Sequence, residues 1–116
     1  MLFDVVADEH QCYTILRVTG DLDVATAPRL RQEAVRVTSG GARHLVIDLS
    51  GVDFLDSTGL GVVVGVLKRV RGLGGSLQVV VTERRVRKVF EITRLDEILD
   101  LRDTLDDVVV EGPSNG

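Results

Sequence analysis

Residues 44–64 read HLVIDLSGVDFLDSTGLGVVV, and this stretch decides the fold class. The apolar run at residues 45–47 is typical of a strand that is covered on both faces. From about Ser57 to residue 71 the apolar spacing becomes that of a helix with one buried side. That buried side is predicted to hold Leu60, Val63, Val64, Leu67 and Val70. A buried strand followed at once by a helix indicates an α/β domain.

The residues before this stretch predict two strands and a helix. Residues 2–8 (LFDVVAD) and 12–20 (CYTILRVTG) are β-branched and enclose the polar DEHQ, which favours a hairpin. A helix then begins near Thr26, a plausible N-cap, with Pro28 in its first turn. Gly40 and Gly41 end it.

The residues after it continue the alternation. GLGG at 72–75 ends the central helix, and SLQVVV at 76–81 predicts a strand. Residues 82–95 predict a helix, because Val86, Val89, Phe90 and Thr93 share one face. Residues 97–101 (EILDL) predict a short strand, and 103–110 (DTLDDVVV) a last amphipathic turn or two.

The expected fold is therefore an α/β mixed sheet with about four helices. The leading hairpin is antiparallel, and the later strands are parallel because each pair is joined by a helical crossover. We expect one domain at residues 1–110 and a disordered tail at 111–116, where EGPSNG has no apolar side chain.

Composition excludes several classes of protein. The chain has 116 residues, 44% of them hydrophobic, and a net charge of −4, which argues against a nucleic-acid binder. The basic run at residues 84–88 is interpreted as a solvated helix face. A single cysteine, Cys12, excludes an internal disulfide. The start lacks a signal-peptide pattern, and the longest apolar run (60–67) is too short to span a membrane, so we expect a cytoplasmic protein.

Enzyme chemistry finds little support in the motifs. Gly59, Gly61 and Gly65 give G-x-G-x-x-x-G, which differs from the dinucleotide fingerprint, although a small nucleotide-binding enzyme stays an alternative. Ser57 is not in a G-x-S-x-G motif, and the histidines lie elsewhere in the chain, in the hairpin and at a strand start. The four loop acids, interpreted as turn and capping residues rather than metal ligands, are Asp21, Asp23, Asp53 and Asp56. We expect no cofactor, no metal and no catalytic residue.

Ser57 is the candidate functional residue. A phosphate there would add about −1.5 to −2 charges beside the free N–H groups of a helix start, so the fold should tolerate it. The main effect would be on what docks nearby. On another side of the same helix, Val62, Val66 and Arg69 are either covered by the domain or form a patch for a protein partner.

Two motifs resemble the anti-sigma factor antagonists built on the STAS domain. They are GDLDVATAPRL (20–30) and, more specifically, the quoted stretch with its D-S-T-G-L. VFEITRLDEILDL (89–101) is similar more loosely, and around Thr93 to Leu95 it departs from the glycine-containing connection common in relatives. The resemblance covers residues 1–110.

This resemblance implies a non-enzymatic switch in transcription regulation. The unphosphorylated protein binds an anti-sigma factor that is also a serine kinase, phosphorylation ends the binding, and a serine phosphatase resets it. The acceptor corresponds to Ser57, with Thr58 as a secondary candidate. Asp23 and Asp56 correspond to the loop acids, and with Val62, Val66 and Arg69 they are the expected partner-binding residues. The alternative is a STAS scaffold in a transporter or stress-sensing complex.

Overall fold

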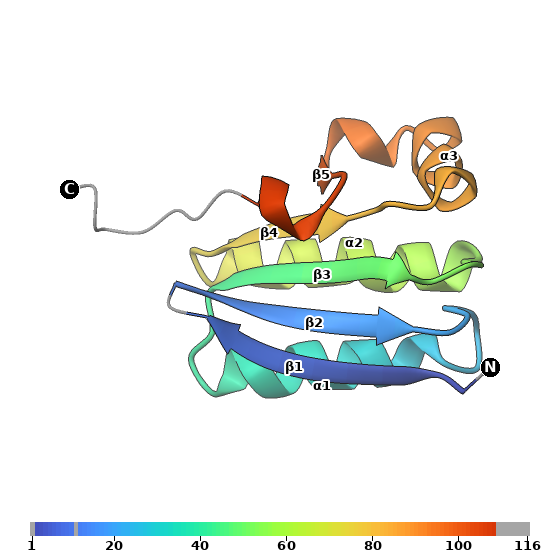
Figure 1. Cartoon of the computed structure of the whole chain (residues 1–116). Coiled ribbons are helices and arrows are strands. Elements are labelled where there is room, and N and C mark those ends of the chain that lie inside the picture. The colour runs from blue at the N-terminus through green and yellow to red at the C-terminus, as the bar shows by residue number, and fades with distance from the viewer. Residues whose placement is uncertain (1, 11, 109–116) are drawn as a thin grey trace.

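The computed structural model describes residues 2–10 and 12–108, so the expected tail at 111–116 lies outside the described residues. Five strands form one sheet in the order β1-β2-β3-β4-β5 (Figure 1). The strands are β1 (Asp4–His10), β2 (Tyr13–Thr19), β3 (His44–Gly51), β4 (Ser76–Val80) and β5 (Asp100–Arg102). The helices are α1 (Ala27–Ser39), α2 (Ser57–Gly72) and α3 (Arg84–Ile92), with 3-10 turns η1 (Leu95–Glu97) and η2 (Leu105–Asp107).

The sheet is mixed, as predicted from the order of the elements. β1 pairs with β2 in antiparallel register, so that Val6 lies opposite Arg17. The pairs β2–β3, β3–β4 and β4–β5 are all parallel. The carboxyl ends of β2 and β3 therefore lie at the same edge of the sheet, and the loops leading to α1 and α2 leave from there (Figure 1).

The expectation of about four helices is wrong for the described residues, which contain three α-helices. As far as residue 108, where the description ends, the segment after β5 forms one 3-10 turn, η2. Thr104 and Asp107 cap this turn reciprocally, and the chain is extended again at Val108. Three consecutive valines follow the acids in the sequence, and β-branched residues disfavour a longer helix. Val109 and Val110 lie outside the described residues.

Helices α1 and α2 lie side by side against one face of the sheet (Figure 1). Leu60, Val63, Leu67 and Val70 of α2 are buried, as predicted. The prediction that Val64 is buried was wrong, because this side chain is only half-buried. Val66 is buried in its place, with 3% of it exposed. Because α2 packs against α1 as well as against the sheet, its buried side is wider and is turned toward α1.

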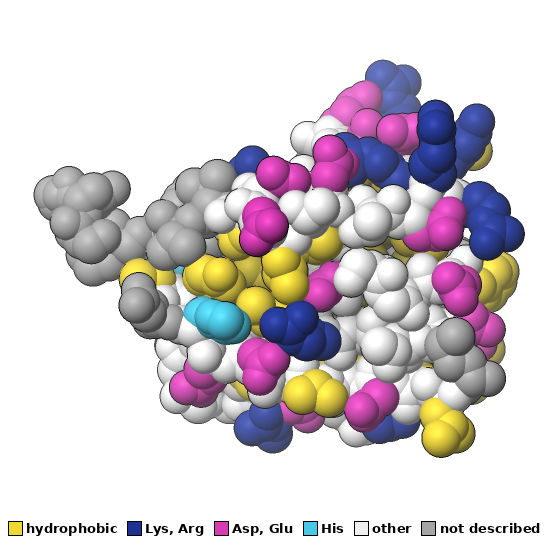
Figure 2. Space-filling view, in the orientation of Figure 1, with side chains coloured by type: hydrophobic (Ala, Val, Ile, Leu, Met, Phe, Trp, Pro, Cys, Tyr) yellow, Lys and Arg dark blue, Asp and Glu magenta, His cyan; other side chains and the backbone are white. Residues whose placement is uncertain are grey.

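Val86 and Phe90 of helix α3 belong to the main core and are buried as predicted, while Thr93 is exposed. The basic run lies on its outer side, where Figure 2 shows basic side chains gathered. Arg84, Arg85 and Lys88 are exposed there, which confirms the interpretation of a solvated face. No helix in the described ranges combines the length and apolar character needed to cross a bilayer.

Candidate functional site

The loops that follow β2 and β3 are joined by backbone hydrogen bonds. The N–H of Leu22 donates to the carbonyl of Phe54 (2.9 Å), and the N–H of Asp56 donates to the carbonyl of Leu22 (3.2 Å). Leu22 and Leu55 thus form a single parallel bridge beyond the ends of the strands, and both side chains are buried. The bridge gives both loops one fixed arrangement at the start of α2.

Asp56 caps helix α2 and also holds the neighbouring loop. Its Oδ1 accepts a hydrogen bond from the N–H of Gly59 (3.0 Å), which satisfies one of the free donors of the first turn. Its Oδ2 accepts from the N–H of Val24 (3.2 Å). The interpretation of Asp56 as a capping residue is therefore confirmed, and the same carboxylate connects the two loops.

Asp23 organises the turn that leads into α1. Its Oδ1 accepts from the N–H groups of Ala25 (3.0 Å) and Thr26 (3.1 Å). Thr26 occupies the N-cap position as predicted, but its side chain makes no capping bond to the helix. Instead, its hydroxyl donates to the carbonyl of Asp21 (2.6 Å) and accepts from the N–H of Asp23 (2.9 Å). Asp23 and Thr26 therefore hold the loop that faces Asp56.

Glycine is required at position 59 for a structural reason that is unrelated to nucleotide binding. A Cβ at this position would lie 2.6 Å from the carbonyl oxygen of Leu22, which is closer than any real contact of that kind. Only glycine lets the first turn of α2 approach the loop after β2 this closely. A cavity of about 670 Å³ is lined by neither Gly59 nor the other glycines of α2. It lies at the other end of the sheet, beside His10 and His44.

Ser57 and Thr58 are the first two residues of α2, and both are exposed. Among the described residues neither hydroxyl takes part in a hydrogen bond, because the capping acceptor is the preceding Asp56. No imidazole lies beside them, since His44 begins β3 at the opposite end of that strand and its Nδ1 contacts Ser76 Oγ (2.8 Å). The Ser57 hydroxyl is thus presented to solvent without a base of its own.

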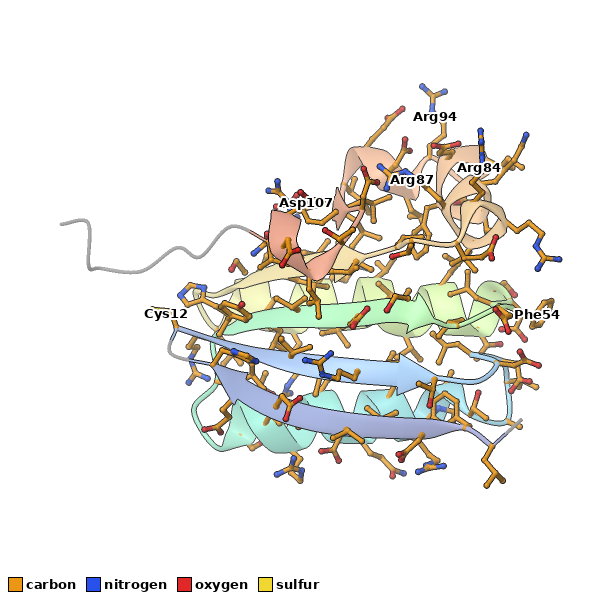
Figure 3. The ribbon with its side chains drawn as sticks, in the orientation of Figure 1. Cys12, Phe54, Arg84, Arg87, Arg94 and Asp107 are labelled. Carbon is orange, nitrogen blue, oxygen red and sulfur yellow. The ribbon has the colours of Figure 1, made fainter. Side chains whose placement is uncertain are left out.

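Two exposed apolar residues near Ser57 were missed by the sequence reasoning. Val24 is 70% exposed and Phe54 is 53% exposed, one in each of the joined loops. Figure 3 shows Phe54 pointing away from the body of the domain at the end where β3 finishes. The exposure of Phe54 could have been inferred from its neighbour Leu55. Neighbouring side chains of an extended segment point to opposite sides, and Leu55 is the apolar side chain that points inward. Isolated exposed apolar residues are common, but these two stand in loops that are bonded to each other.

The three candidates farther along α2 occupy different environments. Val62 is half-buried. Of the two environments considered for Val66, the structure shows the covered one: it belongs to the main core cluster and is 3% exposed. Arg69 is half-buried and donates through Nε to Thr38 Oγ1 (2.6 Å), which ties the end of α2 to α1.

The comparisons with known proteins agree with this fold. The model of the STAS domain family matches residues 4–108. The anti-sigma-B factor antagonist of Bacillus subtilis (strain 168) is 42% identical over 86 residues, which cover 74% of this chain and 78% of that protein. An anti-sigma factor antagonist from Mycobacterium paratuberculosis has a crystal structure with a TM-score of 0.85 and 32% identity, covering 91% of this chain and 90% of that chain.

A more distant structure shows the same fold. The phosphorylated form of SpoIIAA, a cell fate determinant of Bacillus, has a TM-score of 0.68 and 20% identity, and the match covers 91% of this chain and 95% of that chain. At this identity the likeness concerns the fold alone. Since the family model spans nearly all of the described residues and the Bacillus subtilis relative is 42% identical, the chain belongs to the STAS domain family.

Proposed function

We propose that this chain is an anti-sigma factor antagonist whose binding to an anti-sigma factor is switched off by phosphorylation of Ser57. The proposal rests on the Ser57 hydroxyl, which is exposed and forms no hydrogen bond among the described residues. Ser57 is the first residue of α2, and the cap of this helix is supplied by Asp56. The names of the relatives support it, since those in Bacillus subtilis and Mycobacterium paratuberculosis are anti-sigma factor antagonists.

The partner in this proposal is an anti-sigma factor with serine kinase activity. The Ser57 oxygen attacks the γ-phosphorus of ATP, a new P–O bond forms, and the bond to the β-phosphate oxygen breaks to release ADP. The hydroxyl proton passes to a base of the kinase, because no imidazole stands beside Ser57. Thr58 is a secondary acceptor, exposed on the same turn. A serine phosphatase hydrolyses the phosphoester and restores the binding form.

Phosphorylation changes the surface more than the fold. The phosphate adds about −1.5 to −2 charges at neutral pH. It stands at the positive end of the α2 dipole, which favours it, and beside the Asp56 carboxylate and the exposed Asp53. The α2 cap does not depend on the Ser57 hydroxyl, so the helix start is retained. A partner shaped for the unmodified loop then meets the added negative charge and bulk of the phosphate.

The docking surface comprises the two joined loops and the exposed side of α2. Phe54 and Val24 supply the apolar contact area, and exposed aromatic residues near the centre of an interface often contribute most of the binding energy. Asp23 and Asp56 hold the loops in shape and leave a negative edge for basic groups of the partner. Val62 and Arg69 extend the surface along α2.

The test uses Ser57→Ala and Ser57→Asp as paired baits in lysate of the source organism, with mass spectrometry of the retained proteins. We expect a small ATP-binding kinase on the Ala bait that is lost from the Asp bait. Lys88→Gln is the control, since it makes the same change in net charge at an exposed position on α3. Equal retention of that kinase by both Ser57 variants contradicts the proposal, and a transporter or a large complex on both favours a scaffold.

A further inference from the structure

A shallow groove of about 310 Å³ runs between α1 and α2, the two helices that lie side by side behind the sheet (Figure 1). Its floor and walls are small or apolar side chains, and arginines stand at its rim. The lining residues are Arg31, Ala34, Val35, Gly61, Val62, Gly65, Val66 and Arg69. Val35 is 37% exposed and Val62 is half-buried, so apolar surface remains open there.

Gly61 and Gly65 are not needed for packing against the residues that the structure describes. A Cβ at either position would have nothing within 4 Å, in contrast to Gly59, where it would collide with Leu22. Glycine inside a helix lowers helix stability relative to alanine. Two such glycines on the open side of α2 therefore weaken the isolated domain without improving any described contact. Their position is consistent with close approach by another molecule.

The groove begins about one helical turn beyond Ser57, the proposed phosphorylation site. Ser57, Gly61 and Gly65 are spaced four residues apart, so they lie above one another on one side of α2. An α-helix is the element that suits a groove between two helices, because glycines at this spacing allow a closer approach than the usual 8–10 Å between axes. A partner helix lying there would end next to Ser57.

The rim of the groove is cationic. Arg31 is exposed, and among the described residues neither Arg31 nor Arg69 takes part in an ion pair. Arg69 is directed by hydrogen bonds to Thr38 Oγ1 and Ser39 Oγ, which are neutral groups and leave its charge uncompensated. In a chain with a net charge of −4, two unpaired cations beside an apolar groove complement carboxylates of a partner.

We propose that this groove receives an α-helix of the anti-sigma factor, with small or apolar residues toward Gly61 and Gly65 and carboxylates toward Arg31 and Arg69. The inference rests on the proposed function for the identity of the partner. It adds a reason for the switch, since a phosphate on Ser57 stands at the end of the groove. There it repels carboxylates at the end of the bound helix that lies nearest Ser57.

The first test places the photo-crosslinking residue p-benzoylphenylalanine at Val35, irradiates the protein in lysate of the source organism, and sequences the crosslinked peptide. We expect a helical segment of a kinase with acidic residues beside an apolar stripe. Such a segment from a protein that is not a kinase supports the groove and contradicts the proposed function. A crosslink to a second copy of this chain, or none to any protein, overturns the groove proposal.

The second test separates binding from folding. Gly61→Ala and Gly65→Ala should each raise the melting temperature by a few degrees, because the added methyl group meets nothing in the domain. Each should weaken binding of the kinase retained by the Ser57→Ala bait at least tenfold. Gly72→Ala is the matched control, also in α2 with open space but outside the groove, and should leave binding unchanged. Unchanged binding by Gly61→Ala and Gly65→Ala overturns the groove proposal. Because the kinase in this measurement is one that binds Ser57→Ala, that result leaves the proposed function standing.

Discussion

The carboxylate of Asp56 accepts a hydrogen bond from the backbone N–H of Val24, a residue 32 positions earlier in the chain. The other oxygen of the same carboxylate caps the first turn of α2 through Gly59. One side chain therefore sets both the start of the helix that carries Ser57 and the position of the loop opposite. The shape of the candidate docking surface depends on this residue more than on the serine itself.

Replacing Asp56 with alanine should lower the free energy of unfolding by about 2 kcal/mol, since it removes an N-cap and a second hydrogen bond between loops. Urea unfolding followed by circular dichroism measures the difference. Asp53→Ala is the control: Asp53 is exposed and takes part in no hydrogen bond or ion pair within the described residues, so its change should stay within about 0.5 kcal/mol. Equal losses from both variants would mean that the cap contributes little.

Replacing Gly59 with alanine should lower the free energy of unfolding by about 1–3 kcal/mol, the range for overpacked sites. The new methyl group would lie 2.6 Å from the carbonyl oxygen of Leu22, so the helix start and the loop after β2 must separate. Thermal unfolding alongside Gly61→Ala gives the comparison, because the latter site has open space. If both variants gain stability, the close approach of Gly59 to Leu22 is not present in solution.

Replacing Arg94 with glycine should raise the free energy of unfolding. Arg94 follows α3 with φ = 62°, the left-handed conformation that glycine adopts without penalty. The left-handed penalty of about 1–2 kcal/mol, less the extra entropy that glycine loses on folding, leaves a gain of roughly 0.5–1 kcal/mol.

Arg94→Ala serves as the comparison in the same unfolding experiment. It loses the contact of the Arg94 guanidinium with Glu97 (3.1 Å) but keeps the left-handed residue, so it should not be stabilised. Stabilisation of the alanine variant to the same extent as the glycine variant would show that the side chain, and not the backbone conformation, is unfavourable.

Replacing Phe54 with alanine should weaken partner binding at least tenfold and change the free energy of unfolding by less than about 1 kcal/mol, because the ring is half exposed. Calorimetric titration with the purified partner and thermal unfolding give the two values. Ile92→Ala is the control, since Ile92 is 72% exposed on α3 and outside the proposed surface. A large loss of stability without a loss of affinity would place Phe54 among the core residues.

Local patterns in the sequence were enough for the class of fold and for the position of the candidate site. The apolar run at residues 45–47, the switch to helical spacing at Ser57 and the glycines after each helix depend only on neighbours a few residues away. The parallel and antiparallel parts of the sheet follow from the order of the elements, because crossover helices dictate strand direction. The approach of Asp56 to the start of α2 was predictable for the same local reason.

The environment of each side chain was decided only by the tertiary structure. Val66 is buried and Val64 is half-buried because α1 lies against α2, a contact that no local pattern encodes. Gly59 is required by the carbonyl of Leu22, which approaches from a loop far away in the chain. Periodicity reports which side of a helix faces inward, but burial and close contact depend on residues distant in sequence. For that reason the sequence determined where Ser57 lies in the fold, and the packing of two loops and two helices determined the surface around it.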